Sequence, residues 1–301
     1  MKIGIIGMGW VGTSIAASIL RRGVANELWL NDIRPEIAEG EAMDLAHGSS
    51  FYPPAVVRAV ELDEMCRADA VVIAAGRGGG PGQSRLELLN ENATIVAKIA
   101  ESLRGLAGLL IVVTNPVDIM TRVAVAASGL DRTRVIGTGT MLDTARLRYA
   151  VGRELQLDAR SIHAQVIGEH GDSEVVLWSS ATVGGVRLRD WRGWGERREA
   201  EIAEEVRCAA YEIIKRKGAT NHAIGLVTAA LLQWTLGPEH RVLTIASVQD
   251  ERFDGVAFSL PTIVGPRGIV EVLMPEMSAS ERAGLQRSVE VLGEAYDSMV
   301  W

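Results

Sequence analysis

The first half of the chain alternates short apolar runs with amphipathic stretches. The runs are of strand length and are bounded by glycines or polar residues, which is typical of strands buried on both faces. We predict strands at residues 2–6, 27–30, 56–60, 69–75, 109–113 and 135–137, and helices ending at residue 22 and spanning residues 35–46, 62–67 and 86–104. Strands that alternate with helices predict a doubly wound parallel sheet, so the first half is expected to be an α/β domain.

The second half has a different order of elements. We predict helices at residues 142–155, 196–217, 278–300 and from about residue 225 to 236, and strands at residues 161–167, 241–248, 256–264 and 269–273, with strand-like segments over 175–186. Grouped strands and grouped helices indicate an α+β domain, which would hold a substrate. The expected division is 1–138 for the first domain and 139–301 for the second, and the Trp- and Arg-rich stretch 187–194 receives no role.

Composition limits the classes of partner. With 48% hydrophobic and 23% charged residues, the chain can bury a full core, and its formal net charge of −7 argues against nucleic acid or an anionic membrane. The start of the chain lacks the succession of a signal peptide and no apolar run is long enough for a membrane, so we expect a cytoplasmic protein. Cys66 and Cys208 lie far from each other and from any Cys or His motif, which predicts neither a metal site nor a disulfide.

A glycine-rich turn follows the first predicted strand. Gly7, Gly9 and Gly12 allow a tight turn, a close approach of backbone N–H groups to a pyrophosphate, and close packing of the helix on the strand. Asp32 ends the second strand about twenty residues later, where a carboxylate meets the ribose hydroxyls of NAD. The pattern therefore predicts a Rossmann-type dinucleotide site that prefers NAD, although the nearby Arg34 leaves NADP open.

The segment 76–85 cannot hold a helix or a strand, because it contains five glycines and a proline. It is either a plain connection or a lid at the carboxyl end of a central strand, where open α/β sheets place their ligands. A lid would carry Arg85 over a substrate on closure. Asn115, after the strand at 109–113, is in the same way either a turn-former or a group that binds both a nicotinamide ribose and a substrate.

The segment GEHGDS at 168–173 presents a histidine in surroundings that suit a cavity better than a core. Imidazole needs two hydrogen-bond partners and titrates near neutral pH, so His170 is a candidate acid/base, the alternative being a structural or surface histidine. Asp143 and Arg146 share a helix face, as either a surface ion pair or part of this site. Arg148 is turned to the other side of that helix, and His163 alternates outward from its apolar strand neighbours.

Taken together, these segments resemble the L-lactate/malate dehydrogenase family, and the bacterial L-lactate dehydrogenases most closely. The resemblance covers essentially the whole chain and is carried, in order, by GMGWVG with Asp32, TNPVD, TMLDTARLR, GEHGDS and KGATNHAIG. It implies an NAD-dependent 2-hydroxy acid dehydrogenase. A metal-dependent family-4 glycosidase on the same scaffold would need a Cys or His ligand set that the chain lacks, and an NAD sensor would not need this set of ionisable residues.

The resemblance implies a role for each candidate residue. His170 would donate and accept the proton with Asp143 as its partner, Arg146 would bind the substrate carboxylate through its planar fork, and Arg85 would polarise the ketone oxygen. Asn115 would orient substrate and cofactor, and Ile224 would press on the nicotinamide ring. The implied cofactor-binding residues are Gly7, Gly9, Val11, Gly12, Asp32, Asn115 and Ile224.

Substrate choice rests on fewer residues. The lid position that discriminates substrates in the family falls on Gly79, which is neither the Gln of lactate enzymes nor the Arg of malate enzymes. A glycine makes no ionic bond and leaves room, so a monocarboxylate is favoured. Thr220 matches the threonine at the pocket floor of lactate enzymes. Lactate is therefore the expected substrate, while Arg77 keeps malate open and the room at Gly79 keeps a broader range of 2-hydroxy acids open.

The resemblance also gives Arg148 and His163 a second interpretation. In bacterial lactate dehydrogenases activated by fructose 1,6-bisphosphate, an Arg and a His at these positions meet their twins across a subunit interface. Two cations per subunit, doubled by symmetry, suit a bisphosphate. We therefore hypothesise a homo-oligomer, a dimer or a homotetramer, that this glycolytic effector regulates, the alternative being a structural role at an unregulated interface.

Overall fold

The structure is a computed structural model that describes residues 1–78 and 84–301, with Arg85 described by its backbone only. The helices that position the site are α1 (Trp10–Arg22), α2 (Pro35–His47), α3 (Arg85–Ser102), α4 (Val117–Ser128), α5 (Met141–Leu155), α6 (Glu196–Lys217), α7 (His222–Thr235) and α8 (Ala279–Asp297). The central strands are β1 (Lys2–Ile6), β2 (Glu27–Asn31), β3 (Val56–Ala59), β4 (Ala70–Ile73), β5 (Leu109–Val112) and β6 (Val135–Gly137). The predicted helix over residues 62–67 is a short 3-10 helix (Leu62–Arg67).

The first six strands are parallel and lie in the order β3-β2-β1-β4-β5-β6. This is the order of a Rossmann-type sheet, so the predicted fold class is confirmed. The chain adds β2 and β3 on one side of β1, and then adds β4, β5 and β6 on the other side of β1. The carboxyl ends of β1, β2, β4 and β5 therefore bring the glycine turn, Asp32, the start of the glycine-rich segment and Asn115 to one edge of the sheet.

The sheet does not end at β6. Strands β12 (Arg241–Val248), β13 (Ala257–Gly265) and β14 (Gly268–Val272) continue it, because Ala246 pairs with Gly137 and β13 and β14 follow in antiparallel order. The result is one sheet of nine strands. The predicted division at residues 138 and 139 places these strands in the second domain, yet they pair with the sheet of the first, because β6 would present an unpaired edge without them.

The rest of the second half carries two small sheets. The predicted strand at 161–167 is two strands, β7 (Ile162–His163) and β8 (Val166–Ile167). Strand β7 pairs with β10 (Thr182–Val183), whereas β8 pairs with β9 (Val175–Val176). One run of apolar residues therefore contributes a strand to each of two sheets. Strand β11 (Val186–Arg187) completes the sheet β11-β10-β7.

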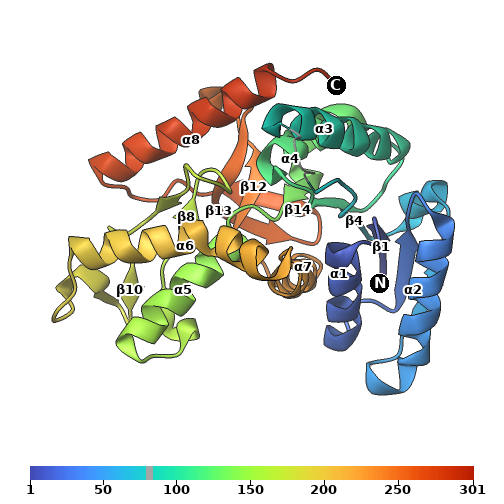
Figure 1. Cartoon of the computed structure of the whole chain (residues 1–301), viewed down its shortest axis with the longest axis horizontal. Helices are drawn as coiled ribbons and strands as arrows, with labels where there is room; N and C mark the ends of the chain where they lie inside the picture. The colour runs from blue at the N-terminus through green and yellow to red at the C-terminus, as the bar shows by residue number, and fades with distance from the viewer. Residues whose placement is uncertain (79–83) are drawn as a thin grey trace.

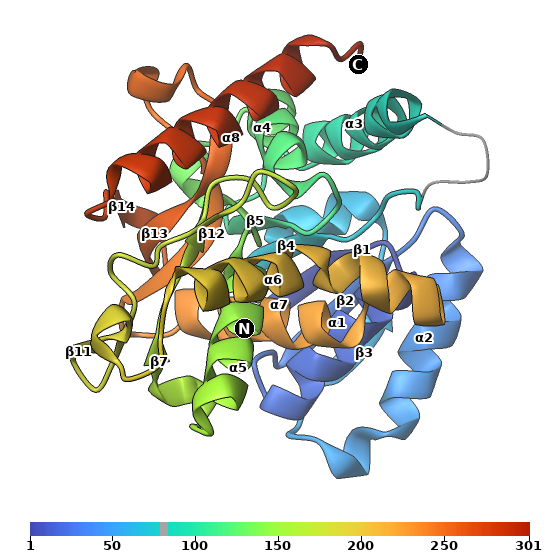
Figure 2. The same ribbon diagram turned by 60° about the vertical axis from the view of Figure 1, so that its left-hand side comes forward.

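Helices cover both faces of the large sheet (Figure 1). Buried side chains of α1 and α7 meet on one face and those of α3 and α4 on the other, and both apolar clusters contain residues from both halves of the chain. Helices α5 and α6 extend to one side of the sheet in Figure 1. Helix α8 packs against β13 and β9, and Figure 2 shows it above β13. No helix within residues 1–78 and 84–301 is long and apolar enough to cross a membrane.

The Trp- and Arg-rich stretch that the sequence left without a role builds a small core of its own. The rings of Trp178 and Trp194 lie 6.0 Å apart, and Leu188 is buried beside them. Glu199 is also buried and accepts hydrogen bonds from both Arg189 and the indole of Trp194. The stretch therefore anchors the start of α6.

Candidate active site

The glycine turn after β1 has the geometry that a dinucleotide needs. Gly7 has a φ of +96°, and a Cβ on Gly12 would come within 1.9 Å of the Gly7 carbonyl oxygen, so larger residues are excluded at both positions. Among residues 1–78 and 84–301, no atom would lie within 4 Å of a Cβ on Gly9, and no side chain caps the N-terminus of α1. Open space in front of uncapped N–H groups suits a pyrophosphate, so these residues fit NAD.

Asp32 lies beside this turn at the end of β2. Its Oδ2 accepts the N–H of Met8 at 2.8 Å, and its Oδ1 accepts the N–H of Arg34 at 3.0 Å. The carboxylate is thereby fixed at the mouth of the crevice, where the ribose hydroxyls are expected. Val11 and Ile224 both pack against the apolar cluster that α1 and α7 share.

The loop between β8 and β9 holds His170. Gly168 forms a β-bridge with Ser259 of β13, and Glu169 Oε2 accepts hydrogen bonds from the backbone and the hydroxyl of Ser173. Both ends of the loop are therefore fixed. His170 lies between them and donates its own backbone N–H to Asp118 Oδ2 at 2.7 Å.

Three of the predicted residues meet in one hydrogen-bonded group. His170 Nδ1 lies 2.5 Å from Asp143 Oδ2, and Arg146 Nη1 donates to Asp143 Oδ1 at 2.8 Å. The Asp143 side chain is only 3% exposed, while those of Arg146 and His170 are 15% and 24% exposed. A buried carboxylate thus holds an imidazole and a guanidinium that both still reach the solvent-facing side.

The charges of this group reinforce one another. Burial opposes ionisation of Asp143, but His170 and Arg146 outweigh it and hold the pKa of Asp143 below its usual range. Burial also lowers the pKa of His170, but the carboxylates of Asp143 and Asp118 raise it to about 9. His170 therefore carries its proton at neutral pH, as a proton donor to a carbonyl oxygen must.

Two further acids, Asp118 and Glu174, belong to the site and are not among the residues predicted from the sequence. Burial raises the pKa of Asp118 to about 7 and that of Glu174 to about 8. Asp118 is part of the TNPVD motif and Glu174 directly follows GEHGDS, so both motifs carried a signal. Nothing in the spacing could show that the two side chains fold in beside His170.

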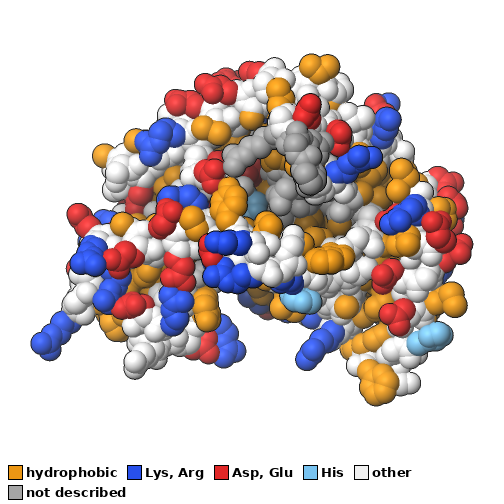
Figure 3. All heavy atoms as spheres, in the orientation of Figure 1, with side chains coloured by type: hydrophobic (Ala, Val, Ile, Leu, Met, Phe, Trp, Pro, Cys, Tyr) orange, Lys and Arg blue, Asp and Glu red, His pale blue; other side chains and the backbone are white. Residues whose placement is uncertain are grey.

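Arg146 also faces a cavity of about 430 Å³ that α5, α6 and the start of α7 enclose. Thr220 lines the same cavity, so the structure brings these two predicted substrate residues together. Basic side chains gather on this face where α6 ends, and the last turn of α6 carries Lys215, Arg216 and Lys217 (Figure 3). Positive charge at the mouth of the cavity favours an anionic substrate.

The structure describes only part of the segment 76–85, which the sequence predicts to be either a plain connection or a lid. Gly79 lies outside the described residues, and so does the side chain of Arg85, which begins α3. Asn92 of α3 accepts the N–H of Arg77 and donates to the carbonyl oxygens of Arg77 and Asn115. Asn115, exposed after β5, precedes a cis proline bond, and its Oδ1 accepts the N–H of Val117.

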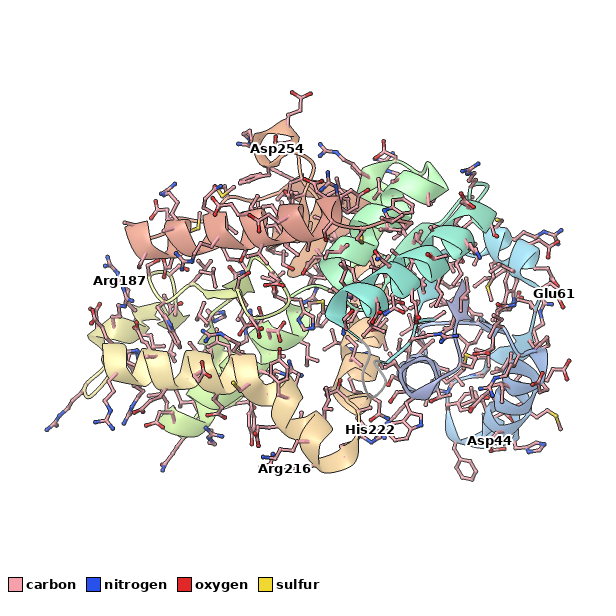
Figure 4. All side chains as sticks on the ribbon, turned by 45° about the horizontal axis from the view of Figure 1, so that its top comes forward. Asp44, Glu61, Arg187, Arg216, His222 and Asp254 are labelled. Carbon is pink, nitrogen blue, oxygen red and sulfur yellow. The ribbon has the colours of Figure 1, made fainter. Side chains whose placement is uncertain are left out.

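Arg148 and His163 lie apart from this group. Arg148 Nε donates to the carbonyl of Ala164 at 3.0 Å, and burial lowers its pKa. His163 is exposed on β7 and shares a cross-strand row with Thr182 and Arg187. Figure 4 shows Arg187 at the outer end of the second half, far from the start of α7, where His222 is labelled. The row of His163 and Arg187 therefore lies away from the cavity that Arg146 and Thr220 line.

A dinucleotide crevice next to a buried carboxylate, an imidazole and an arginine defines a nicotinamide-dependent dehydrogenase of carboxylic acid substrates. The model of the lactate/malate dehydrogenase NAD binding domain matches residues 1–137, and that of the lactate/malate dehydrogenase alpha/beta C-terminal domain matches residues 140–300. The chain belongs to the lactate/malate dehydrogenase family. Both the predicted family and the predicted cofactor, NAD, are confirmed.

Relatives match over the full length. The chain is 43% identical to an L-lactate dehydrogenase of Kosmotoga olearia, covering 100% of this chain and 97% of the relative. It is 41% identical to an L-lactate dehydrogenase of a Synechococcus species, covering 100% of both chains. The crystal structure of a minor L-lactate dehydrogenase from Enterococcus mundtii, in its ligands-bound form, superposes with a TM-score of 0.96 at 38% identity, covering 99% of this chain and 98% of that chain.

Proposed function

We propose that this protein is an NAD-dependent L-lactate dehydrogenase, which interconverts pyruvate and L-lactate. The hydrogen-bonded group of Asp143, His170 and Arg146 beside the dinucleotide crevice carries this proposal. The names of its full-length relatives support it. We further propose a cytoplasmic enzyme with a domain boundary between residues 138 and 139, directly after β6.

The described residues supply positioning, charge and a proton. Arg146 uses one N–H on Asp143 and keeps further donors for a bidentate bond to the substrate carboxylate. NADH, when bound in the crevice, supplies the hydride that reduces the carbonyl carbon. His170 donates its proton to the carbonyl oxygen, and Asp143 stabilises the imidazolium before that transfer.

The remaining residues complete the site. Arg85 polarises the carbonyl oxygen when the lid closes, and Asn115 orients the substrate and the nicotinamide ribose. The residues assigned to NAD are Gly7, Gly9, Val11, Gly12, Asp32, Asn115 and Ile224.

Substrate choice is tested by comparing pyruvate with oxaloacetate. We propose that Gly79 and Thr220 leave a monocarboxylate pocket. The guanidinium of Arg77 supports this, because its Nε lies 3.8 Å from Glu91 of α3 and is already paired. Because Gly79 offers no charge to a second carboxylate, kcat/KM for pyruvate is expected to exceed that for oxaloacetate by about tenfold or more.

The measurement is NADH oxidation with both acids on one preparation, with 2-oxobutyrate and 2-oxoisocaproate alongside. Oxaloacetate ahead of pyruvate would identify a malate dehydrogenase in which Arg77 leaves Glu91 for the substrate. In that case Arg77→Gln should reverse the order. A longer 2-oxo acid ahead of pyruvate would show that the room at Gly79 sets a broader range.

Regulation is a separate proposal. We infer that Arg148 and His163 bind fructose 1,6-bisphosphate across a subunit interface of a dimer or tetramer. Arg148 supports this because the Ala164 carbonyl holds its guanidinium next to β7, and Arg187 adds a cation to the row of His163.

The effector is expected to lower KM for pyruvate about fivefold or more, a usual size for allosteric coupling. Arg148→Gln should abolish that change and leave the basal activity intact. Steady-state kinetics with and without the bisphosphate, at several pH values and enzyme concentrations, provide the measurement. Unchanged kinetics of the wild-type enzyme throughout would contradict the proposal.

A further inference from the structure

Two carboxylates on different helices hold His170. Asp143 of α5 binds the imidazole through Nδ1, whereas Asp118 of α4 binds the backbone N–H of the same residue at 2.7 Å. The proposed reaction uses only the first of these acids.

Asp118 has surroundings that are costly for a carboxylate. Asp118 is 2% exposed, and its Oδ1 is buried with no hydrogen-bond partner among residues 1–78 and 84–301. The charged groups that act on it are His170, which attracts, and Glu169 and Asp143, which repel. A protonated His170 is thus the cation that makes an ionised Asp118 tolerable, and Asp118 in turn stabilises that proton.

The place of Asp118 in the fold connects the two halves of the site. It lies in the first turn of α4, three residues after Asn115, whose carbonyl is held by Asn92 of α3. The bond from His170 to Asp118 therefore fixes the distance between the acid/base loop and the turn that faces the nicotinamide.

We propose that Asp118 is a positioning residue of the reaction: its carboxylate fixes the His170 loop against the cofactor half and keeps the imidazole protonated. The inference rests on the proposed function, because it assigns His170 the role of acid. Its chemistry requires no further group, since the only proton that moves is the one on His170.

Asp118 loses its proton at a lower pH than His170 does, so the effect of the Asp118 charge on the pKa of His170 can be measured. The other charged groups around His170 are Asp143 and Arg146 on α5, and Glu169 and Glu174 on its own loop, with Arg207 of α6 acting on Glu174. Burial raises the pKa of Asp118 to about 7, and the pKa of His170 is about 9. Asp118 is therefore charged over the range in which His170 loses its proton, and uncharged near pH 6.

Asp118→Asn keeps an oxygen that can accept the His170 N–H and removes only the charge. The pH above which pyruvate reduction declines is expected to fall by about one unit. At pH 9 kcat/KM should drop about fivefold, because the protonated fraction of His170 falls by that factor, whereas at pH 6 the variant and the wild type should agree. Asp118→Ala also removes the acceptor, so it should lose about tenfold at pH 6 as well.

Asp131→Asn is the matched control. Asp131 also accepts a backbone N–H, that of Thr133 at 2.9 Å, but it lies before β6 at the opposite end of the sheet. This variant changes the net charge in the same way and should follow the wild-type pH profile throughout. NADH binding and thermal unfolding show whether each variant is folded.

An independent titration separates this inference from the proposed function. Isotope-labelled histidine allows the pKa of His170 to be followed by NMR among the five histidines of the chain, without any turnover. A pKa of His170 that is equal in the wild type and in Asp118→Asn would overturn the inference, even with an active enzyme. Absence of turnover with every 2-oxo acid would overturn the proposed function, while the titration would still test Asp118.

Discussion

Replacing His170 with glutamine is expected to lower kcat/KM for pyruvate by about a thousandfold. Glutamine can still donate a hydrogen bond to Asp143, so the buried carboxylate keeps a partner. It cannot release a proton to the carbonyl oxygen, and the alkoxide that forms has no acid. The affinity for NADH should stay within about twofold, because the glycine turn and Asp32 do not contact His170.

Steady-state kinetics with pyruvate and NADH fluorescence titrations measure the two quantities. His47→Gln is the matched control, since His47 ends α2 on the other side of the dinucleotide half and should leave kcat/KM unchanged. A His170→Gln enzyme that retained a tenth of the wild-type kcat/KM would show that another group supplies the proton.

The raised pKa of His170 also determines how the activity depends on pH in each direction of the reaction. The pKa of His170 is raised to about 9, so the protonated form that pyruvate reduction needs is lost as pH rises through about 9. Lactate oxidation needs the neutral imidazole and should instead increase over that range. Opposite pH profiles for the two directions, measured in the same buffers, are the expected result.

Replacing Arg146 with lysine is expected to lower kcat/KM for pyruvate by about a hundredfold or more, mostly through KM. The positive charge remains, but a lysine cannot bind a carboxylate through two parallel hydrogen bonds while it also binds Asp143. The side chain is nearly buried, so a bond that is lost there is not replaced well by water.

The measurement is the dependence of rate on pyruvate concentration, with Arg153→Lys as the control. Arg153 lies on the same helix but pairs with Glu205 at the surface, so its replacement should leave KM unchanged. An unchanged KM in Arg146→Lys would place the substrate carboxylate elsewhere in the cavity. Longer 2-oxo acids that also kept their KM would confirm that reassignment.

Much of the fold could be predicted because local patterns decide it. Apolar runs of strand length must be buried on both faces. When helices alternate with them along the chain, the strands form a parallel sheet and the helices pack on its two faces. The roles of Gly7, Gly12 and Asp32 could also be predicted locally, because the spacing of the glycines indicates a tight turn and the spacing to Asp32 indicates a carboxylate at the end of the next strand. Asp143 and Arg146 are three residues apart on one helix, so their meeting was also predictable.

The association of β12 with β6 could not be predicted. Ala246 and Gly137 are far apart in sequence, and an apolar strand pattern shows that a strand has buried faces but not which strand is its neighbour. The break of residues 161–167 into β7 and β8 has the same origin, because the choice between two pairing partners is made by distant strands.

By itself the sequence determined the Rossmann-type half, the NAD preference carried by Asp32, and the residue types of the catalytic group. Only the tertiary structure decided that His170 lies between two buried carboxylates, because Asp118 comes from the helix before β6 in the chain and Asp143 from the helix after it. The resulting pKa of His170 depends on burial and on charges brought together from distant parts of the chain. Such distances are set by packing, and no spacing along one segment encodes them.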